Sequence, residues 1–301
     1  MTDRNSNVVV VGSGLMGTGI AHAFVSSGYA TLLVDTNDKA LEQARQGIED
    51  ILDAGVKLGK VSAADAATAK SLLKVSTTLD DAPVDASLLI ETVSENLVVK
   101  QSVVKQAAQR LGDTAILATN TSALSVTEIA SVVDKPQRVI GMHFFNPVHK
   151  MKLVELVLGI ATDEQTVADT RAWCDAINKT SILVNESPGL TTSRMSAMLG
   201  NEAMWMLQEG TACAEDIDTA LRMGFNHPMG PLELGDLTGW DTRLAVLKYL
   251  HATLGDKFRP CPLIIKMVAA GRLGRKVGHG VYSYDENGKA LPGSGLKGSN
   301  L

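Results

Sequence analysis

Short apolar runs alternate with longer amphipathic stretches along residues 1–187 of the chain. Continuous apolar runs such as Val8 to Val11 are typical of parallel strands that are covered on both faces. Strands are expected at 8–11, 29–34, 88–92, 115–119, 138–142, 152–158 and 181–184. Helices are expected after the first strand up to about Gly28, at 97–111, from a capping box at Ser125, and at 164–177. This alternation predicts an α/β fold with a doubly wound, Rossmann-type sheet.

After residue 187 the pattern changes to helical periodicity, with no convincing strand until near the end of the chain. A stripe of apolar residues at helical spacing ends just before Gly210, and further helices are expected near 214–223, 244–254 and 261–270. The stripe comprises Met195, Met198, Leu199, Ala203, Met206 and Leu207. A methionine-rich stripe is most simply a core or a dimer interface. We therefore expect a domain of residues 1–187 and a second, all-helical domain of residues 188–301.

Residues 37–74 form an insert that is long for a simple crossover between strands. It is expected to contain two helices joined near Gly59, the second beginning at Ser62, and to project from the sheet. Lys57 and Lys60 flank the turn between these helices. Charged residues at such a place usually form a solvated helix end, and the residue pattern alone favours that interpretation.

Composition narrows the class of protein without identifying it. The net charge of −5 does not favour nucleic-acid binding, and the three widely spaced cysteines favour neither a disulfide framework nor a zinc site. The polar N-terminus leaves no room for a signal peptide, and no apolar run approaches the roughly 18 residues of a membrane span. The C-terminal Ser-Asn-Leu resembles a peroxisomal address but lacks its basic residue. A cytoplasmic protein is expected.

The first strand runs into a glycine-rich turn, Gly12-Ser13-Gly14-Leu15-Met16-Gly17, which opens the first helix. In a βαβ unit these glycines allow a tight turn, close approach of a pyrophosphate, and close packing of helix on strand. Asp35 ends the second strand, 18 positions after Gly17. There it can accept hydrogen bonds from a ribose and repel a 2′-phosphate, which predicts NAD over NADP. The alternative is a glycine turn that serves only packing.

Two strands carry the strongest candidates for catalysis. His143 follows an apolar strand at its carboxyl end, where ligands bind in open α/β sheets. Glu155 lies on an apolar face of the next strand, where a carboxylate is costly unless it is paired. A turn at Asn146-Pro147 could bring the two strands together, so that Glu155 orients His143 as a general base. Alternatively, Glu155 bonds to the backbone and His143 merely caps a strand.

Other polar residues are less specific. Ser122 also follows a strand, so its hydroxyl could bond a substrate oxygen or be an ordinary turn residue. His22 and His251 lie within expected helices and are interpreted as packing or surface residues.

Together these motifs resemble the L-3-hydroxyacyl-CoA dehydrogenase family, including its 3-hydroxybutyryl-CoA dehydrogenases, over nearly the whole chain. The segments that carry the resemblance are GSGLMGTGIA, ETVSEN, ATNTSALS, HFFNPVHKMKLVE, NHPMGPLELGD and GRKVGHGVYSY. The resemblance implies that His143 and Glu155 form the catalytic pair and that Ser122 binds the substrate oxygen. It assigns NAD to Gly12 through Gly17, Asp35, Glu95, Lys100, Ser122, Asn146 and Lys276. It implies coenzyme A along the projecting helices near Lys57 or Lys60, and a C-terminal domain that dimerises.

One position departs from the family pattern. Ser193 stands where many members have an asparagine that contacts substrate, so it is a candidate site residue with fewer donors. We expect an NAD-dependent oxidoreductase that interconverts (S)-3-hydroxyacyl-CoA and 3-oxoacyl-CoA in fatty-acid metabolism or β-oxidation. The alternatives are a dehydrogenase of a free hydroxy acid, of gulonate or carnitine type, and a non-catalytic, crystallin-like protein on the same scaffold.

Overall fold

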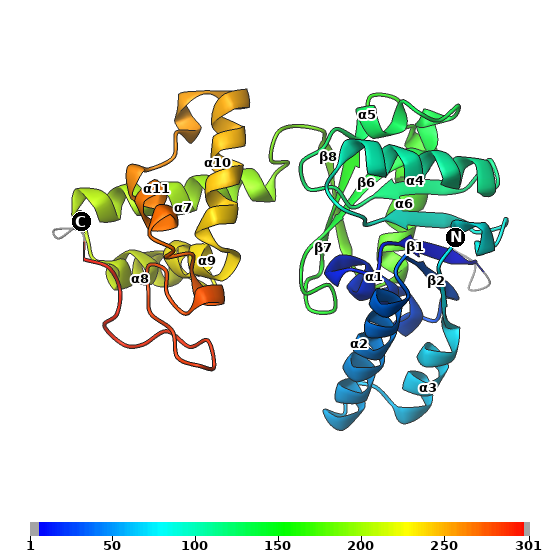
Figure 1. Cartoon of the computed structure of the whole chain (residues 1–301), viewed down its shortest axis with the longest axis horizontal. Coiled ribbons are helices and arrows are strands. Elements are labelled where there is room, and N and C mark those ends of the chain that lie inside the picture. The colour runs from blue at the N-terminus through cyan, green and yellow to red at the C-terminus, as the bar shows by residue number, and fades with distance from the viewer. Residues whose placement is uncertain (1–5, 298–301) are drawn as a thin grey trace. The chain divides into compact units, whose positions relative to one another are not determined.

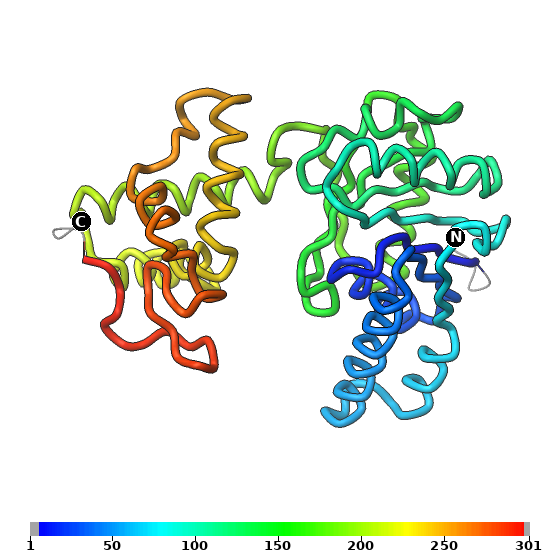
Figure 2. The backbone as a smooth tube through the Cα atoms, viewed as in Figure 1, coloured from blue at the N-terminus to red at the C-terminus, as the bar shows by residue number. Residues whose placement is uncertain are grey.

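The computed structural model describes residues 6–297 (Figures 1 and 2). The chain divides into two compact units, the first ending at Ser187 and the second beginning at Pro188. The N-terminal segment and the Ser-Asn-Leu terminus, on which the expectations about targeting rest, lie partly or wholly outside the described residues.

The first unit is built on one eight-stranded sheet with the order β3-β2-β1-β4-β5-β6-β7-β8. Its strands are β1 (Val8–Val11), β2 (Thr31–Val34), β3 (Leu73–Ser76), β4 (Leu88–Glu91), β5 (Ile116–Thr119), β6 (Val139–Phe144), β7 (Leu153–Leu158) and β8 (Thr180–Asn185). Strands β1 to β6 are parallel, β7 is antiparallel to β6, and β8 is parallel to β7. The carboxyl ends of six strands therefore share one edge with the start of β7.

Helices cover both faces of this sheet, as the sequence pattern predicts (Figure 1). The helices are α1 (Leu15–Ser26), α2 (Asp38–Lys57), α3 (Ala63–Leu72), α4 (Leu97–Arg110), α5 (Val126–Ala130) and α6 (Glu164–Ala176). One face packs against α1 and α6, where the rings of Phe24, Tyr29 and Trp173 meet edge to face. The other face is covered by α4 and α5. The doubly wound α/β fold is confirmed.

The insert differs from the expected pair of helices in one respect. Its last residues form β3, an edge strand beside β2, although the pattern placed Lys74 in the helical insert. An edge strand is open to solvent on one side, so Lys74 and Val75 are exposed and no continuous apolar run marks it. One face of helix α2 packs against the sheet core through Leu41, Ala44, Ile48 and Leu52. Its last turn continues beyond that core with α3 beside it (Figure 1).

The second unit is helical around its own core. Its helices are α7 (Thr192–Glu209), α8 (Ala214–Gly224), α9 (Pro231–Thr238), α10 (Trp240–Leu254) and α11 (Pro262–Ala269). The helix α9 was not expected, because its eight residues begin at a proline in a glycine-rich stretch. The methionine-rich stripe divides: Ala203 and Leu207 are buried, whereas Met195 and Leu199 are exposed. From α11 to residue 297 the chain continues without a helix longer than one turn (Figure 2).

Within the described residues, no helix has both the length and the apolar character that a bilayer crossing requires. The three cysteines, Cys174, Cys213 and Cys261, are all free thiols. No group of three metal-ligating side chains occurs in that part of the chain.

Candidate active site

The turn between β1 and α1 can be built only with glycine at two positions. Gly12 has a positive φ of 101°, and a Cβ there would lie 2.8 Å from the hydroxyl oxygen of Thr92. A Cβ on Gly17 would lie 1.8 Å from the carbonyl oxygen of Gly12. A Cβ on Gly14, by contrast, would meet nothing within 4 Å, so space is left above the start of α1. The turn thus combines dense packing below with an open helix N-terminus, the arrangement that receives a phosphate.

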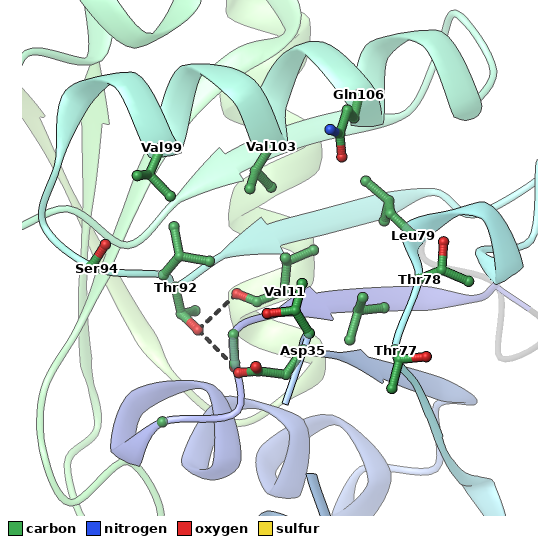
Figure 3. A pocket seen from close by; sticks show the side chains of 15 residues that line it. Val11, Asp35, Thr77, Thr78, Leu79, Thr92, Ser94, Val99, Val103 and Gln106 are labelled. Carbon is green, nitrogen blue, oxygen red and sulfur yellow. Dashed lines mark hydrogen bonds between the residues drawn. The ribbon is translucent and has the colours of Figure 1, made fainter. Parts of the chain in front are cut away.

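A pocket of about 530 Å³ lies beside this turn (Figure 3). Asp35 lies on one side of it and Val99 and Val103 of α4 lie on the opposite side, and Gly12 and Gly14 are also in its lining. Other lining residues are Val11, Val34, Thr36, Thr77, Thr78, Leu79, Thr92, Val93, Ser94 and Gln106. Its apolar walls and single carboxylate suit a flat, apolar ring that carries a hydroxylated sugar. This is what the adenosine half of NAD presents.

Asp35 is held in place by the glycine-rich turn itself. Its Oδ2 accepts hydrogen bonds from the amide and the hydroxyl of Ser13, both at 2.8 Å, and its Oδ1 accepts from the amide of Asn37. Burial alone would raise the pKa of Asp35, but these hydrogen bonds outweigh burial and lower it. The carboxylate is therefore charged at neutral pH and faces the pocket. Nearby, Leu15 is largely exposed and Met16 is half-buried.

His143 and Glu155 lie directly opposite each other on the antiparallel strands β6 and β7. Nδ1 of His143 is 2.7 Å from Oε2 of Glu155, whose side chain is fully buried. The contact at Nδ1 fixes the imidazole so that Nε2 is the nitrogen available for proton transfer. His143 lies next to the end of β6, which continues to Phe144 rather than ending at Met142 as expected. The ring of Phe145 packs against the imidazole at a centroid distance of 4.7 Å.

Ser122 lies in the loop after β5, and Glu95 binds this loop. Oε1 of Glu95 accepts from the amide and, at 3.3 Å, from the hydroxyl of Ser122. It also accepts from the hydroxyl of Thr121 and the amide of Ala123. Glu95 and Ser122, both predicted from the resemblance to contact NAD, are thus brought together by the fold.

Lys100, also predicted to contact NAD, is buried in an ion-pair cluster. Its ammonium lies 2.9 Å from Glu91 and 3.3 Å from Glu95. Sequence analysis did not identify Glu91 as part of the site. The available signal was a carboxylate at the end of an otherwise apolar central strand, which is costly to bury without a partner.

The turn between β6 and β7 contains Asn146, followed by a cis peptide bond to Pro147. Lys179, the residue before β8, holds this turn in place. Its buried ammonium donates to the carbonyl oxygens of Val148 and Met151, at 2.5 and 2.7 Å. Burial lowers the pKa of Lys179. Sequence analysis missed this residue too, because a lone lysine before a strand carries no recognisable signal.

The remaining predicted residues lie elsewhere in the two units. Lys57 and Lys60 are exposed at the end of α2 and after it, and no carboxylate within residues 6–297 pairs with either. In the second unit, Ser193 lies in the first turn of α7, and Lys276 binds both oxygens of Asp241, at 2.7 and 2.6 Å. The histidines expected to be structural are so placed: His22 is buried in α1, and His251 pairs with Asp256 at the surface.

A nucleotide-binding turn beside a sheet that also carries a histidine–carboxylate pair defines an NAD-linked oxidoreductase of the doubly wound class. Comparisons with known proteins agree. Residues 7–187 match the 3-hydroxyacyl-CoA dehydrogenase NAD binding domain, and residues 189–284 match the C-terminal domain of the same family. The chain belongs to the 3-hydroxyacyl-CoA dehydrogenase family.

Similar individual proteins cover nearly the whole chain. A probable 3-hydroxybutyryl-CoA dehydrogenase of Bacillus subtilis is 41% identical over 93% of this chain and 97% of its own. The 3-hydroxybutyryl-CoA dehydrogenase of Clostridioides difficile is 41% identical over 93% of this chain and 99% of its own. The crystal structure of (S)-3-hydroxybutyryl-CoA dehydrogenase from Ralstonia eutropha has a TM-score of 0.89 and 41% identity, covering 94% of this chain and all of that one.

Proposed function

We propose that this protein interconverts (S)-3-hydroxyacyl-CoA and 3-oxoacyl-CoA with NAD as coenzyme, and that its substrate is a short-chain thioester such as 3-hydroxybutyryl-CoA. The observation that carries the proposal is the 2.7 Å contact between His143 and the fully buried Glu155. Proton transfer at an alcohol carbon requires a base of this kind. The choice of a four-carbon substrate rests on the names of the similar proteins from three bacteria.

In the oxidative direction, Nε2 of His143 takes the proton of the C3 hydroxyl. Glu155 stabilises the imidazolium that forms, and the Ser122 hydroxyl holds the substrate oxygen as its charge changes. NAD, when bound, supplies the hydride acceptor. In the reductive direction, His143 returns the proton to the same oxygen. Because Glu155 contacts Nδ1, its role is to orient and stabilise the imidazole, and it does not itself touch the substrate.

The pocket and the glycine-rich turn support part of the proposed coenzyme-binding set. We propose that the pyrophosphate lies at Gly12 to Gly17, with Ser13, Leu15 and Met16 around it, and that Asp35 binds the adenosine ribose. A charged Asp35 would repel the additional phosphate of NADP, which supports NAD as the coenzyme. Glu95, Ser122, Asn146 and Lys276 are proposed to contact the nicotinamide half, and Lys100 to act there through Glu95.

Coenzyme A carries phosphates, and the exposed lysines at the tip of the insert suit them. We propose that Lys57 or Lys60 binds coenzyme A, since neither ammonium is neutralised by a carboxylate within residues 6–297. Ser193 is proposed to contact the acyl group. Its single hydroxyl offers fewer hydrogen-bond donors than the asparagine of many family members. The free thiols support a reducing compartment such as the cytoplasm. The exposed Met195 and Leu199 support a homodimer through the second unit.

The test is the absorbance of NADH with purified protein and acetoacetyl-CoA. Rapid loss of NADH with the thioester, and little loss with free acetoacetate or with NADPH in place of NADH, is the expected result. Turnover of free acetoacetate at the rate of the thioester would instead favour a dehydrogenase of free acids. His143→Gln should remove most of the turnover and leave the dissociation constant of NADH nearly unchanged. Unchanged turnover in this variant would remove the assignment of His143.

A further inference from the structure

Three charged side chains beside the loop of Ser122 form one connected cluster. Glu91 ends β4, Lys100 lies in α4, and Glu95 lies in the connection between them. The ammonium of Lys100 is 2.9 and 3.1 Å from the two oxygens of Glu91, and 3.3 Å from Oε2 of Glu95. Glu91 and Lys100 are 0% and 1% exposed. A buried ion pair of this kind is weak evidence for stability, because desolvation offsets much of the attraction. The presence of this buried ion pair therefore needs an explanation other than stability.

Glu91 fixes the end of β5, from which the loop of Ser122 begins. Its Oε2 accepts from the hydroxyl of Thr119 at 2.7 Å, and its carbonyl oxygen accepts from the amide of Asn120 at 2.8 Å. Its Oε1 also accepts from the amide of Val93, which sets the direction of the chain towards Glu95. One buried carboxylate thus holds both the start of the Ser122 loop and the start of the segment that carries Glu95.

Glu95 fixes the rest of that loop. Its Oε1 accepts from Thr121, Ser122 and Ala123, with distances of 2.7 Å to the Thr121 hydroxyl and 2.9 Å to the Ser122 amide. Burial alone would raise the pKa of Glu95, but the Thr121 hydrogen bond and the charge of Lys100 outweigh burial and lower it. All positions from 119 to 123 are therefore attached to Glu91 or Glu95, and Lys100 joins these two carboxylates.

The same loop is attached to the strand of the catalytic histidine. Oδ1 of Asn120 accepts from the amide of Phe144, the residue after His143, at 2.8 Å. The loop geometry therefore sets the position of the Ser122 hydroxyl relative to the imidazole of His143. Catalysis is sensitive to such spacing, since a misplacement of about 1 Å can cost about 100-fold in rate.

We propose that Glu91 is a positioning residue for Ser122 and acts through Lys100 and Glu95. This inference rests on the proposed function. Glu91 reaches neither the solvent nor the pocket, so it contacts no substrate itself. Its charge keeps the ammonium of Lys100 shared between Glu91 and Oε2 of Glu95, so that Oε1 of Glu95 stays directed at the loop. Without that charge, Lys100 has Glu95 as its one anionic partner in the cluster and draws it off the loop.

The experiment is a double-mutant cycle in the acetoacetyl-CoA assay, with Glu91→Gln, Ser122→Ala and the double variant. Glu91→Gln keeps the shape of the side chain and an acceptor for Thr119. We expect kcat to fall by about 10- to 100-fold in Glu91→Gln. In the Ser122→Ala background the same substitution should cost less than about threefold, because Glu91 acts through Ser122. Glu164→Gln, the same change at an exposed glutamate of α6, is the matched control and should behave as wild type.

Two results overturn the inference while the wild-type protein is active. One is a kcat of Glu91→Gln within about threefold of wild type, and the other is an equal loss with and without Ser122, which indicates a general structural role. If Glu91→Gln does not fold, the double variant Glu91→Met with Lys100→Met leaves no unpaired buried charge. If this double variant folds and has the kcat of wild type, the inference is also overturned. A wild-type protein that oxidises no NADH with the thioester refutes the proposed function, and this inference with it.

Discussion

The buried carboxylates of the two units have different hydrogen-bond and ion-pair partners. In the first, Glu155 meets the imidazole of His143 and Glu91 meets the ammonium of Lys100. In the second, Asp236 and Asp218 are 0% and 1% exposed, and within residues 6–297 they accept hydrogen bonds from neutral groups, namely backbone amides, an indole and tyrosine hydroxyls. A buried carboxylate that faces an ionisable nitrogen can take part in moving or steering charge, whereas a fully buried one that faces neutral donors holds the chain in place.

Asp236 shows the second arrangement in full. It accepts from the indole of Trp240 at 2.6 Å, from the amides of Val281 and Tyr282, and from the hydroxyl of Tyr284. Burial and the negative charge of Asp236 raise the pKa of Tyr284 far above its ordinary value, so this hydroxyl keeps its proton at any physiological pH. Burial and Asp218, to which the Tyr282 hydroxyl donates, do the same for the pKa of Tyr282. The chain at 281–284 is thereby attached to α9 through neutral donors.

The largest expected effect is on the rate, in the first unit. Glu155→Gln keeps a hydrogen bond to Nδ1 of His143 but removes the charge that stabilises the imidazolium. We expect kcat to fall by about 100-fold or more, with the free energy of unfolding within about 1 kcal/mol of wild type. Steady-state kinetics and urea unfolding measure the two quantities. A kcat within threefold of wild type would contradict the catalytic role of the pair.

The matching change in the second unit should have the opposite profile. Asp236→Asn replaces an acceptor of four hydrogen bonds by an amide, whose own N–H groups face other donors. We expect the free energy of unfolding to fall by about 3 kcal/mol, because hydrogen bonds to a charged group are each worth about 1.5–3 kcal/mol. The kcat per folded molecule should stay within about threefold. A large loss of kcat in folded protein would break the contrast between the units.

His22 is the intermediate case, an ionisable group buried without a carboxylate. Burial, then the charges of His149 and Lys179, lower the pKa of His22 from 6.5 to about 4. The unfolded chain therefore binds a proton more readily than the folded one between about pH 4 and 6.5, so stability rises with pH across this window and is lost on acidification. From pH 7 to pH 5 this group costs about 2 kcal/mol of unfolding free energy.

His22→Gln should remove that part of the pH dependence, since glutamine does not titrate and can still bond Ser26. Urea unfolding of both proteins at pH 7 and pH 5 is the measurement. His251→Gln is the control, because His251 lies at the surface. If the free energy of unfolding falls by the same amount between pH 7 and pH 5 in His22→Gln and in wild type, other groups are responsible for the pH dependence.

The smallest expected effect concerns lysines that, unlike Lys100, have no carboxylate partner in the described part of the chain. Reversing the charge of Lys57 and Lys60 together, to Glu, should raise the KM for acetoacetyl-CoA by about 3- to 10-fold, because exposed charge contacts are each worth up to about 1 kcal/mol. The KM for NADH should not change, and added salt should reduce the difference. Lys105→Glu, on an exposed position of α4, is the control. An equal rise in both KM values would refute a specific role in binding coenzyme A.

Much of this architecture could be predicted because it is local. The β1–α1 turn, Asp35 and the apolar strands need only neighbouring residues, and the period of two in a strand indicated that Glu155 needed a partner. What escaped prediction depends on distant partners. Glu91 is 9 positions from Lys100 and 28 from Thr119, and Lys179 is about 30 from the turn that it secures. The spacing of strand or helix residues links none of these positions, and only the folded chain brings the groups together.

The antiparallel pairing of β6 with β7 also limits which insertions and deletions the connection between these strands can accept. His143 and Glu155 are opposed because the connection between the strands has its present number of residues. A single inserted or deleted residue that shifted this pairing by one would bring Val154 or Leu156 opposite His143, and every side chain of β7 would change faces. Both replacements are aliphatic, so the sheet could still be apolar while the imidazole lost its carboxylate. We therefore expect insertions and deletions between Phe145 and Lys152 to be tolerated far less well than substitutions at the same positions.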